Sequence, residues 1–194
     1  NIIENMNDAR KFLRAGGEVM PRGLTQFVAP VTDRRIYDEI NIWDKIGHDM
    51  DFATAKKIAL NNMYVYKIAP RELLSENSAH EFDKIDFHKK NESVRTRAAQ
   101  WDLKEPAVIY GLAVWWEAEL IPGVKLSTSP FAPPTHWDQI FLPFLEPIKS
   151  EKKDRLEVSI TSDSRRQIGI RVKWSVKLIR GGKLLQSQTL ATPI

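Results

Sequence analysis

One proline-rich segment of the chain carries the side chains best suited to chemistry. Residues 127–137 read STSPFAPPTHW and place His136 beside Trp137 after three prolines. Each proline fixes its backbone φ near −65° and lacks an N–H donor, so the segment is expected to be a stiff loop. Histidine exchanges a proton near neutral pH, and tryptophan offers a large flat apolar surface. The segment is therefore either a binding loop or a plain connection in which His136 is only hydrogen-bonded.

Two other groups of ionisable side chains have types suited to chemistry. His80 and His88 flank several carboxylates, a set that could bind a metal, although the spacing matches no known ligand pattern and a solvated polar loop is the simpler interpretation. Glu117 and Glu119 lie two residues apart, so one strand face would present both as paired acids. The alternative is that they face solvent or pair across a sheet with Lys173 or Lys177.

Composition limits the class of protein. The 194 residues are 42% hydrophobic and 28% charged, which is typical of a globular chain with one sizeable core. No apolar run approaches the roughly 20 residues that cross a bilayer, so we expect no membrane partner. The net charge is only +4 and the basic residues form no stripe, which disfavours nucleic-acid binding. The absence of cysteine fits a reducing compartment, and a cytoplasmic location is expected.

The N-terminal third is expected to mix helix and extended chain. Residues 1–15 have apolar side chains at helical spacing, and the glycines at 16–17 follow as a helix stop. Residues 19–31 are expected to be extended, with a break at 21–23. The apolar face of the first helix needs a partner, which indicates that the sequence is the tail of something longer.

A helical insertion is expected over about residues 36–68. Apolar residues recur there every three or four positions, Gly47 separates two short helices, and Asp51 can cap the second. The insertion carries Trp43 and Phe52 but has little core of its own. We therefore expect it to pack on a partner surface, the alternative being that it folds back on its own domain.

The C-terminal half is expected to be β. Apolar and polar residues alternate along 108–120, 155–162 and 166–178, and this period of two predicts antiparallel strands with one buried face. In the first of these segments Trp116 is placed on the buried face and Trp115 on the other. Gly181 and Gly182 predict a tight hairpin into a last strand. The expected fold class is mainly β, an antiparallel barrel or sandwich with a helical insertion.

Several segments together resemble one family, the protein arginine N-methyltransferases. The block LSTSPFAPPTHW at 126–137 resembles the family's STSP–THW loop, and Gln139 continues it. ARKFLRAGGEVMP at 9–21 resembles the end of the family's cofactor domain, and FVAPV at 27–31 its first barrel strand. GHDM at 47–50 is similar to a segment of the dimerisation arm, and GLAVWWEAE at 111–119 to the strand before the loop. These matches follow the order of the family.

The resemblance implies a domain division and a function. Residues 1–21 would end a Rossmann-like cofactor domain, and 22–194 would form the barrel domain with its dimerisation arm. It implies S-adenosylmethionine as the cofactor of the full-length enzyme, a homodimer, and a protein or peptide substrate with an arginine. Thr135, His136 and Trp137 would wall the substrate pocket, with His136 in a supporting catalytic role, and Trp43 and Phe52 would lie in the arm.

The resemblance also implies what this chain lacks. The cofactor-binding loop and the paired glutamates that grip a guanidinium would precede residue 1, with Glu4 either a stand-in for the second glutamate or an ordinary surface carboxylate. No cofactor-binding residue, no metal and no methyl transfer are therefore expected of the chain alone. Two alternatives stay open: a non-catalytic barrel module for binding or assembly, and a methyltransferase for a small molecule.

Overall fold

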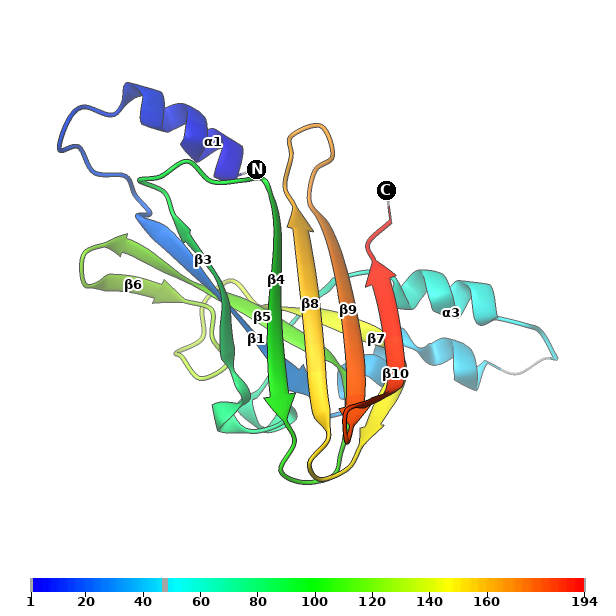
Figure 1. The fold of residues 1–194 in the computed structure, drawn as a ribbon. Helices are drawn as coiled ribbons and strands as arrows, with labels where there is room; N and C mark the ends of the chain where they lie inside the picture. Colours follow the sequence, from blue (N-terminus) through cyan, green and yellow to red (C-terminus); the bar gives the residue numbers. More distant parts are fainter. Residues whose placement is uncertain (1, 47–48, 194) are drawn as a thin grey trace.

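The computed structural model describes residues 2–46 and 49–193, and within them the chain is mainly β (Figure 1). The strands form two antiparallel sheets, one of six strands in the order β2-β7-β5-β1-β3 with β6 added to β5, and one of four in the order β10-β9-β8-β4. The predicted mainly β fold is confirmed. The strand bounds are β1 Gly23–Val31, β2 Tyr64–Tyr66, β3 His80–Asp86, β4 Val94–Asp102, β5 Ala107–Ile121, β6 Val124–Ser127, β7 Gln139–Ser150, β8 Arg155–Asp163, β9 Arg171–Arg180 and β10 Lys183–Ala191.

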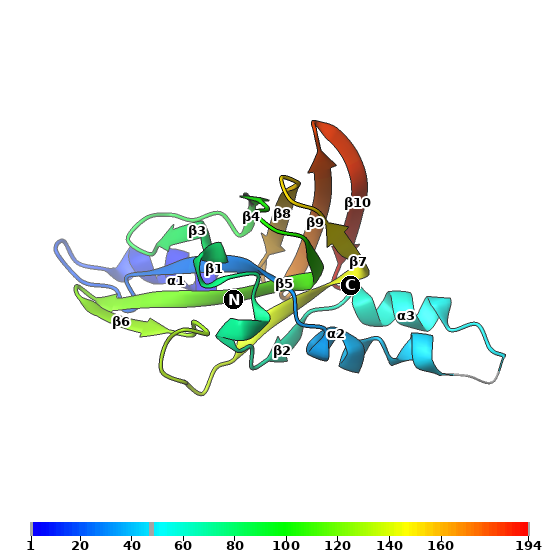
Figure 2. The same cartoon turned by 90° about the horizontal axis from the view of Figure 1, so that it is seen from below.

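The helices lie outside the two sheets. Their bounds are α1 Ile2–Ala9, η1 Arg10–Phe12, α2 Arg35–Ile40, η2 Ile42–Lys45, α3 Ala53–Leu60, η3 Pro70–Glu72 and η4 Glu76–Ser78, where η marks a 3-10 turn. Residues 35–46 and 49–60, which we call the arm, project to one side of the sheets (Figure 2). None of the helices built from described residues has the length and apolar character needed to cross a membrane.

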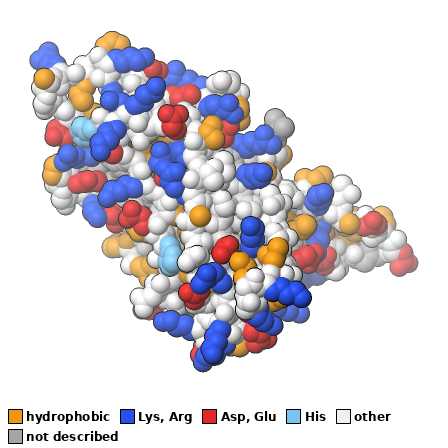
Figure 3. All heavy atoms as spheres, viewed as in Figure 1, with side chains coloured by type: hydrophobic (Ala, Val, Ile, Leu, Met, Phe, Trp, Pro, Cys, Tyr) orange, Lys and Arg blue, Asp and Glu red, His pale blue; other side chains and the backbone are white. Residues whose placement is uncertain are grey.

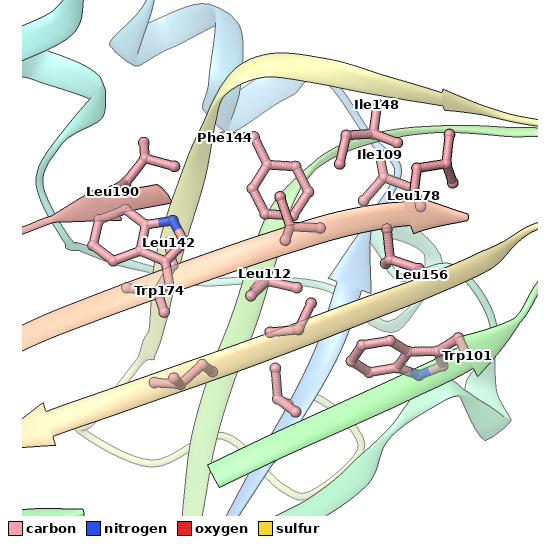
Figure 4. Packing of buried hydrophobic residues seen from close by; sticks show 14 of the residues in the cluster. Trp101, Ile109, Leu112, Leu142, Phe144, Ile148, Leu156, Trp174, Leu178 and Leu190 are labelled. Atoms are coloured by element: carbon pink, nitrogen blue, oxygen red, sulfur yellow. The ribbon is translucent and has the colours of Figure 1, made fainter. Parts of the chain in front are cut away.

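A single apolar core lies between the two sheets. Figure 4 shows Trp174 and Trp101 near opposite ends of it, with Phe144 and Leu112 between them. The indole N–H of Trp174 donates to Pro143 O at 2.8 Å, and that of Trp101 donates to Ser78 O at 2.7 Å. Both large aromatic side chains are therefore buried with their polar atom paired, which removes the main cost of placing them there.

Side chains rather than backbone join the two sheets at their edges. At one edge Asp83 of β3 accepts from Arg95 Nε and Nη2 at 2.7 and 2.6 Å and from Arg97 Nε at 2.9 Å, both on β4. At the other edge Gln188 of β10 accepts from the Glu146 N–H of β7 at 3.0 Å and donates to its carbonyl at 2.7 Å. The fold is thus a β-sandwich whose two sheets are joined at their edges by side-chain hydrogen bonds.

The predictions for β8 and for the last hairpin are confirmed. Leu156, Val158 and Ile160 are buried, and the residues between them face outward. Figure 3 shows mostly uncharged surface over the middle of this outer face, with charged side chains gathered toward its ends. Gly181 and Gly182 both have positive φ, 54° and 79°, as the two-residue turn between β9 and β10 requires.

The prediction for 166–178 is wrong in its first part. β8 ends at Asp163, which pairs with Arg171, so residues 164–170 lie beyond the last rung of the ladder. Ile168 and Ile170 were expected on the buried face, but they are 40% and 63% exposed. An apolar alternation cannot indicate where the partner strand stops.

The prediction for β5 is also wrong, because both of its faces are covered. Ile109 and Leu112 face the core between the sheets, while Ala113 and Trp115 join a second core. That second core includes Ile36, Tyr37 and Ile40 of α2, together with Leu60 of α3. Helix α2 and the end of α3, which we call the root of the arm, thus fold back on the chain's own sheet. Burial there raises the pKa of the Tyr37 hydroxyl.

Other boundaries differ from the sequence predictions. The first helix gives way to a 3-10 turn at Arg10, and the extended segment becomes a strand only at Gly23. The short helices of the insertion are confirmed, but β2 was not predicted. The N-cap of α3 is Phe52 rather than the predicted Asp51, whose Oδ1 accepts from Ala53 N–H at 2.8 Å from one residue further out. The polar region after His80 is a strand, because β3 pairs with β1 and buries Ile85.

The fold leaves no room for a side chain at Gly111. A Cβ there would lie 2.5 Å from Leu142 O and 2.7 Å from the Phe141 ring. We expect Gly111→Ala to cost about 2–3 kcal/mol of unfolding free energy in urea denaturation, since overpacking a filled core costs roughly this much. Gly123→Asn is the control, because that turn glycine has open space around it and asparagine tolerates its positive φ. Equal stability of the two variants would contradict the close approach of β5 and β7.

Candidate functional site

The proline-rich segment forms a loop where the sheet ladder along β5 is interrupted. β5 pairs along one edge with β1. Along its other edge it pairs with β7 up to Val114 and with β6 from Glu117 onward. Residues 128–138, which we call the 128–138 loop, connect β6 to β7 across this gap. The loop therefore emerges opposite Trp115 and Trp116.

The base of the loop is closed by two buried polar side chains. Thr128 Oγ1 accepts from Trp116 N–H at 3.1 Å and donates to Trp116 O at 3.0 Å, and Thr128 N–H donates to the same carbonyl at 3.0 Å. Gln139 Nε2 donates to Thr128 O at 2.8 Å, and its Oε1 accepts from Ile68 N–H at 2.8 Å. Because buried polar groups are costly unless paired, these bonds hold the two ends of the loop in one arrangement.

The loop contacts both faces of β5. Phe131 lies edge-on to Trp115 at 6.5 Å between ring centroids, and Trp137 lies edge-on to Trp116 at 5.8 Å. Consecutive strand residues point to opposite faces, so the two contacts are on opposite sides of the sheet. The sequence assigned Trp116 to the buried face and Trp115 to the other, whereas Trp115 is buried and Trp116 is half-buried. The loop thus packs over the edge of the strand, with one aromatic side chain on each face.

The three predicted pocket residues lie together on one turn of this loop. Thr135 Oγ1 donates to Trp137 O at 2.9 Å and accepts from Trp137 N–H at 3.2 Å. The imidazole of His136 lies edge-on to the Trp137 ring at 6.0 Å and is exposed, and Trp137 is 52% exposed. The turn therefore presents an imidazole and an indole to whatever lies beyond it.

A hollow of about 210 Å³ lies between the loop and residues 67–70. Its walls are mainly apolar, and Lys67 and Asp138 add one charge of each sign. Glu72, two residues after Pro70, is buried and accepts hydrogen bonds from Arg35 Nε and Nη2 at 2.7 and 3.2 Å. These hydrogen bonds raise the pKa of Arg35. The lining residues include Ile68, Ala69, Pro70, Pro130, Pro133, Pro134, Thr135 and Trp137.

The arm places Trp43 and Phe52 in contact, with ring centroids 5.9 Å apart. Trp43 Nε1 and Asn41 Oδ1 are buried with no hydrogen-bond partner among the described residues. Three large apolar side chains of the arm remain exposed, namely Ile42, Met50 and Ile58. Of the segment that resembles the family arm, residues 47–50, positions 47 and 48 lie outside the described residues.

The remaining candidates have other partners. Glu117 pairs with Lys125 of β6 at 2.7 Å, whereas the predicted Lys173 and Lys177 lie on the other sheet. The imidazole of His80 lies 5.0 Å from the Trp101 ring. Over the stretches 2–46 and 49–193, no group of three His, Asp or Glu residues converges in an arrangement suited to a metal.

Glu4, the suggested stand-in for a guanidinium-binding glutamate, contacts the loops before β4 and after β8 instead. Its carboxylate accepts from Ser93 Oγ at 3.3 Å and from Arg166 N–H at 2.9 Å. In the same interface Asn7 and Asn91 exchange two hydrogen bonds at 2.8 and 3.0 Å. Helix α1 is thus docked on the loops at one end of the sheets.

The sequence did not reveal the residues that support the loop. The sequence showed Trp115 and Trp116 as a neighbouring pair and Gln139 as the continuation of a motif. It did not indicate that Trp116 bonds Thr128 or that Gln139 bonds Thr128 and Ile68. Gln139 and Ile68 are 71 residues apart, and Arg35 and Glu72 are 37 apart. Such pairs become visible only in three dimensions.

The fold and the loop agree with the comparisons with known proteins. Residues 24–178 match the model of the arginine methyltransferase oligomerization subdomain, so the chain belongs to the arginine methyltransferase family. Protein arginine N-methyltransferase 6 of Xenopus laevis is 29% identical over 164 residues, covering 78% of this chain and 47% of that protein. The histone-arginine methyltransferase CARMER of Drosophila ananassae is 26% identical, covering 72% and 28%. The chain thus spans about half or less of these relatives.

Solved structures are similar in fold. The chain aligns over its whole length with 63% of a chain in the Trypanosoma brucei PRMT1 enzyme-prozyme heterotetrameric complex with AdoHcy, with a TM-score of 0.83 and 18% identity. It aligns over 89% of its length with Arabidopsis thaliana protein arginine methyltransferase 10, with a TM-score of 0.66 and 16% identity. At such identities the likeness shows the fold alone. The family resemblance seen in the sequence is confirmed.

Thr128 is the anchor on which the start of the loop depends. We expect Thr128→Val to destabilise the chain by about 1–3 kcal/mol, because the Trp116 N–H would lose its buried acceptor. Thr128→Ser is the matched control, since it keeps the hydroxyl. Denaturation measures the loss of stability, and amide hydrogen exchange of Trp116 measures the loss of its hydrogen bond. Equal protection of Trp116 in both variants would refute the anchor.

Proposed function

We propose that this chain is the substrate-binding and dimerisation part of an S-adenosylmethionine-dependent enzyme that methylates arginine guanidinium groups of proteins. The observation that carries the proposal is the 128–138 loop, which is held at its base by buried hydrogen bonds and presents Thr135, His136 and Trp137 on one turn. Membership of the arginine methyltransferase family supports it. The activity belongs to the whole protein, and the chain alone is inactive.

The three residues have chemically distinct tasks in this proposal. A guanidinium packs favourably on an indole face, so Trp137 lines the mouth of the pocket. A guanidinium nitrogen that gains a methyl group loses a proton, and His136 takes up that proton or orients an acidic neighbour that does. Thr135 holds the turn by bonding both backbone groups of Trp137.

The cofactor, S-adenosylmethionine, supplies the methyl group and is bound outside this chain. The hollow beside the loop has about 210 Å³, below the roughly 300–1,000 Å³ of sites that enclose ligands of that size, so we do not assign the cofactor to it. One relative in fold was solved with AdoHcy, which supports this cofactor for the family. We assign residues 1–21 to the end of the cofactor domain and 22–194 to the barrel domain. In this division the family match begins just after the boundary.

The partners follow from the arm and from the family. The arm, including Trp43 and Phe52, makes a homodimer with a second copy. Its exposed Ile42, Met50 and Ile58 and the oligomerization description of the family model support this. The substrate is a protein or peptide with an arginine, and the location is cytoplasmic.

Substitutions on the turn test the activity in the whole protein. We expect His136→Ala to lower kcat about 100-fold, the size typical of a lost proton acceptor. We expect Trp137→Ala to raise KM about tenfold, the size of one lost cation–π contact. The measurement is transfer of labelled methyl from S-adenosylmethionine to an arginine peptide, with a lysine peptide as a blank.

Two variants serve as controls for that assay. His88→Ala removes an imidazole that lies beside Glu18 and outside the loop, and Trp137→Phe keeps an aromatic ring. Both should retain most activity. Unchanged kinetics of His136→Ala and Trp137→Ala, or no methyl transfer by the whole protein, would favour a non-catalytic module or a small-molecule substrate.

The arm is tested through the oligomeric state of the whole protein. We expect Trp43→Ala combined with Phe52→Ala to yield a monomer in light scattering, because the two rings support each other. Phe12→Ala is the control, since Phe12 is exposed in η1 and lies outside the arm. A dimer that survives the double substitution, or a monomeric wild-type protein, would overturn this assignment.

A further inference from the structure

The root of the arm and the 128–138 loop bind neighbouring residues of one short segment. Arg35, the first residue of α2, donates from Nη2 to Lys67 O at 3.0 Å. Ile68 N–H, the next residue along, donates to Gln139 Oε1 at 2.8 Å. In Figure 2 the segment after β2 lies between α2 and the loop after β6. The peptide unit between Lys67 and Ile68 thus binds the arm through its carbonyl and Gln139, at the end of the loop, through its N–H.

Glu72 ties this segment to the arm a second time. Its side chain is almost fully buried and receives two hydrogen bonds from Arg35 and one from Ala69 N–H at 2.6 Å. Its backbone carbonyl accepts from Thr32 N–H at 2.9 Å, just before the arm begins. A buried carboxylate depends on its partner, so Arg35 cannot move away from residues 67–72 without a large cost.

Gln139 ties the same segment to the loop. The residue is 7% exposed, and each end of its amide has one partner, Ile68 N–H and Thr128 O. Thr128 in turn is bonded to the backbone of Trp116, against which Trp137 packs. The amide therefore acts as a spacer of fixed length between residues 67–68 and the base of the loop.

We propose that the Arg35–Glu72 pair and Gln139 form a relay through which the position of the arm root sets the position of Trp137. Arg35, Glu72 and Gln139 are positioning residues that touch no substrate. The relay links arm docking to the shape of the substrate pocket, and only this consequence rests on the proposed function. The relay itself is a property of the folded chain.

Arg34 provides a matched comparison for Arg35. It is the preceding residue and makes an ion pair of the same length, from Nε to Asp38 Oδ2 at 2.7 Å. The Arg34 pair joins the N-cap of α2 to the same helix, whereas the Arg35 pair reaches Glu72, outside the arm. The two adjacent arginines thus separate loss of an ion pair local to α2 from loss of the relay.

The test uses the 194-residue chain labelled with 5-fluorotryptophan and observed by fluorine NMR. Trp137→Phe assigns the Trp137 resonance. We expect Arg35→Gln and Gln139→Met each to move that resonance by more than its linewidth, and Arg34→Gln to leave it in place. In the double variant Arg35→Gln with Gln139→Met, the resonance should match that of Gln139→Met alone, because the relay is already cut.

A second variant guards against loss of the fold. Arg35→Gln leaves the Glu72 charge buried, whereas Glu72→Gln removes that charge and keeps an acceptor for Ala69 N–H. Glu72→Gln should therefore move the Trp137 resonance while the chain stays folded. Arg35→Lys keeps the charge without the two-pronged geometry and should give an intermediate shift.

Two results would overturn the relay. One is a Trp137 resonance that stays in place in both Glu72→Gln and Gln139→Met. The other is an effect of Arg35→Gln of the same size with and without Gln139, which would mean that the arm acts by another route. Neither readout needs methyl transfer, so a failed relay leaves the proposed function standing, and an inactive whole protein leaves the relay standing.

Discussion

The structure depends on one strand, β5, which contributes buried side chains from both of its faces and pairs with other strands along both edges. Ile109 and Leu112 contribute to the core between the sheets, and Ala113 and Trp115 contribute to the second core under the arm. Gly111 lets β7 approach so closely that a single added carbon would meet its backbone. Because both cores meet on this strand, the sandwich, the arm root and the loop cannot be positioned independently.

The 128–138 loop follows from an interruption on the same strand. Where neither β6 nor β7 continues the ladder, Thr128 bonds the Trp116 backbone and the loop closes over both faces of the strand edge. The prolines make the loop stiff, and buried hydrogen bonds at its base make its position unique. Because the chain's own contacts fix this arrangement, we propose it as a preformed wall of the substrate pocket.

Local pattern predicted some elements well and failed where a second layer or a neighbour intervened. Leu156, Val158 and Ile160 alternate with polar residues and are buried as expected, because only one face of β8 is covered. Trp115 was assigned to an open face, since the helices that cover it are distant in sequence. Ile170 kept the apolar alternation but lies past the end of its partner strand, where there is nothing to bury it.

The sequence by itself determined the mainly β class, the hairpin at the paired glycines, the stiff loop with Thr135, His136 and Trp137, and the family. Each of these rests on short-range rules of backbone geometry or on a contiguous motif. Only the tertiary structure decided what holds the loop. Gln139 meets Ile68, and Arg35 meets Glu72, because separate strands and turns converge there. Such contacts arise from packing between distant segments, which no local periodicity encodes.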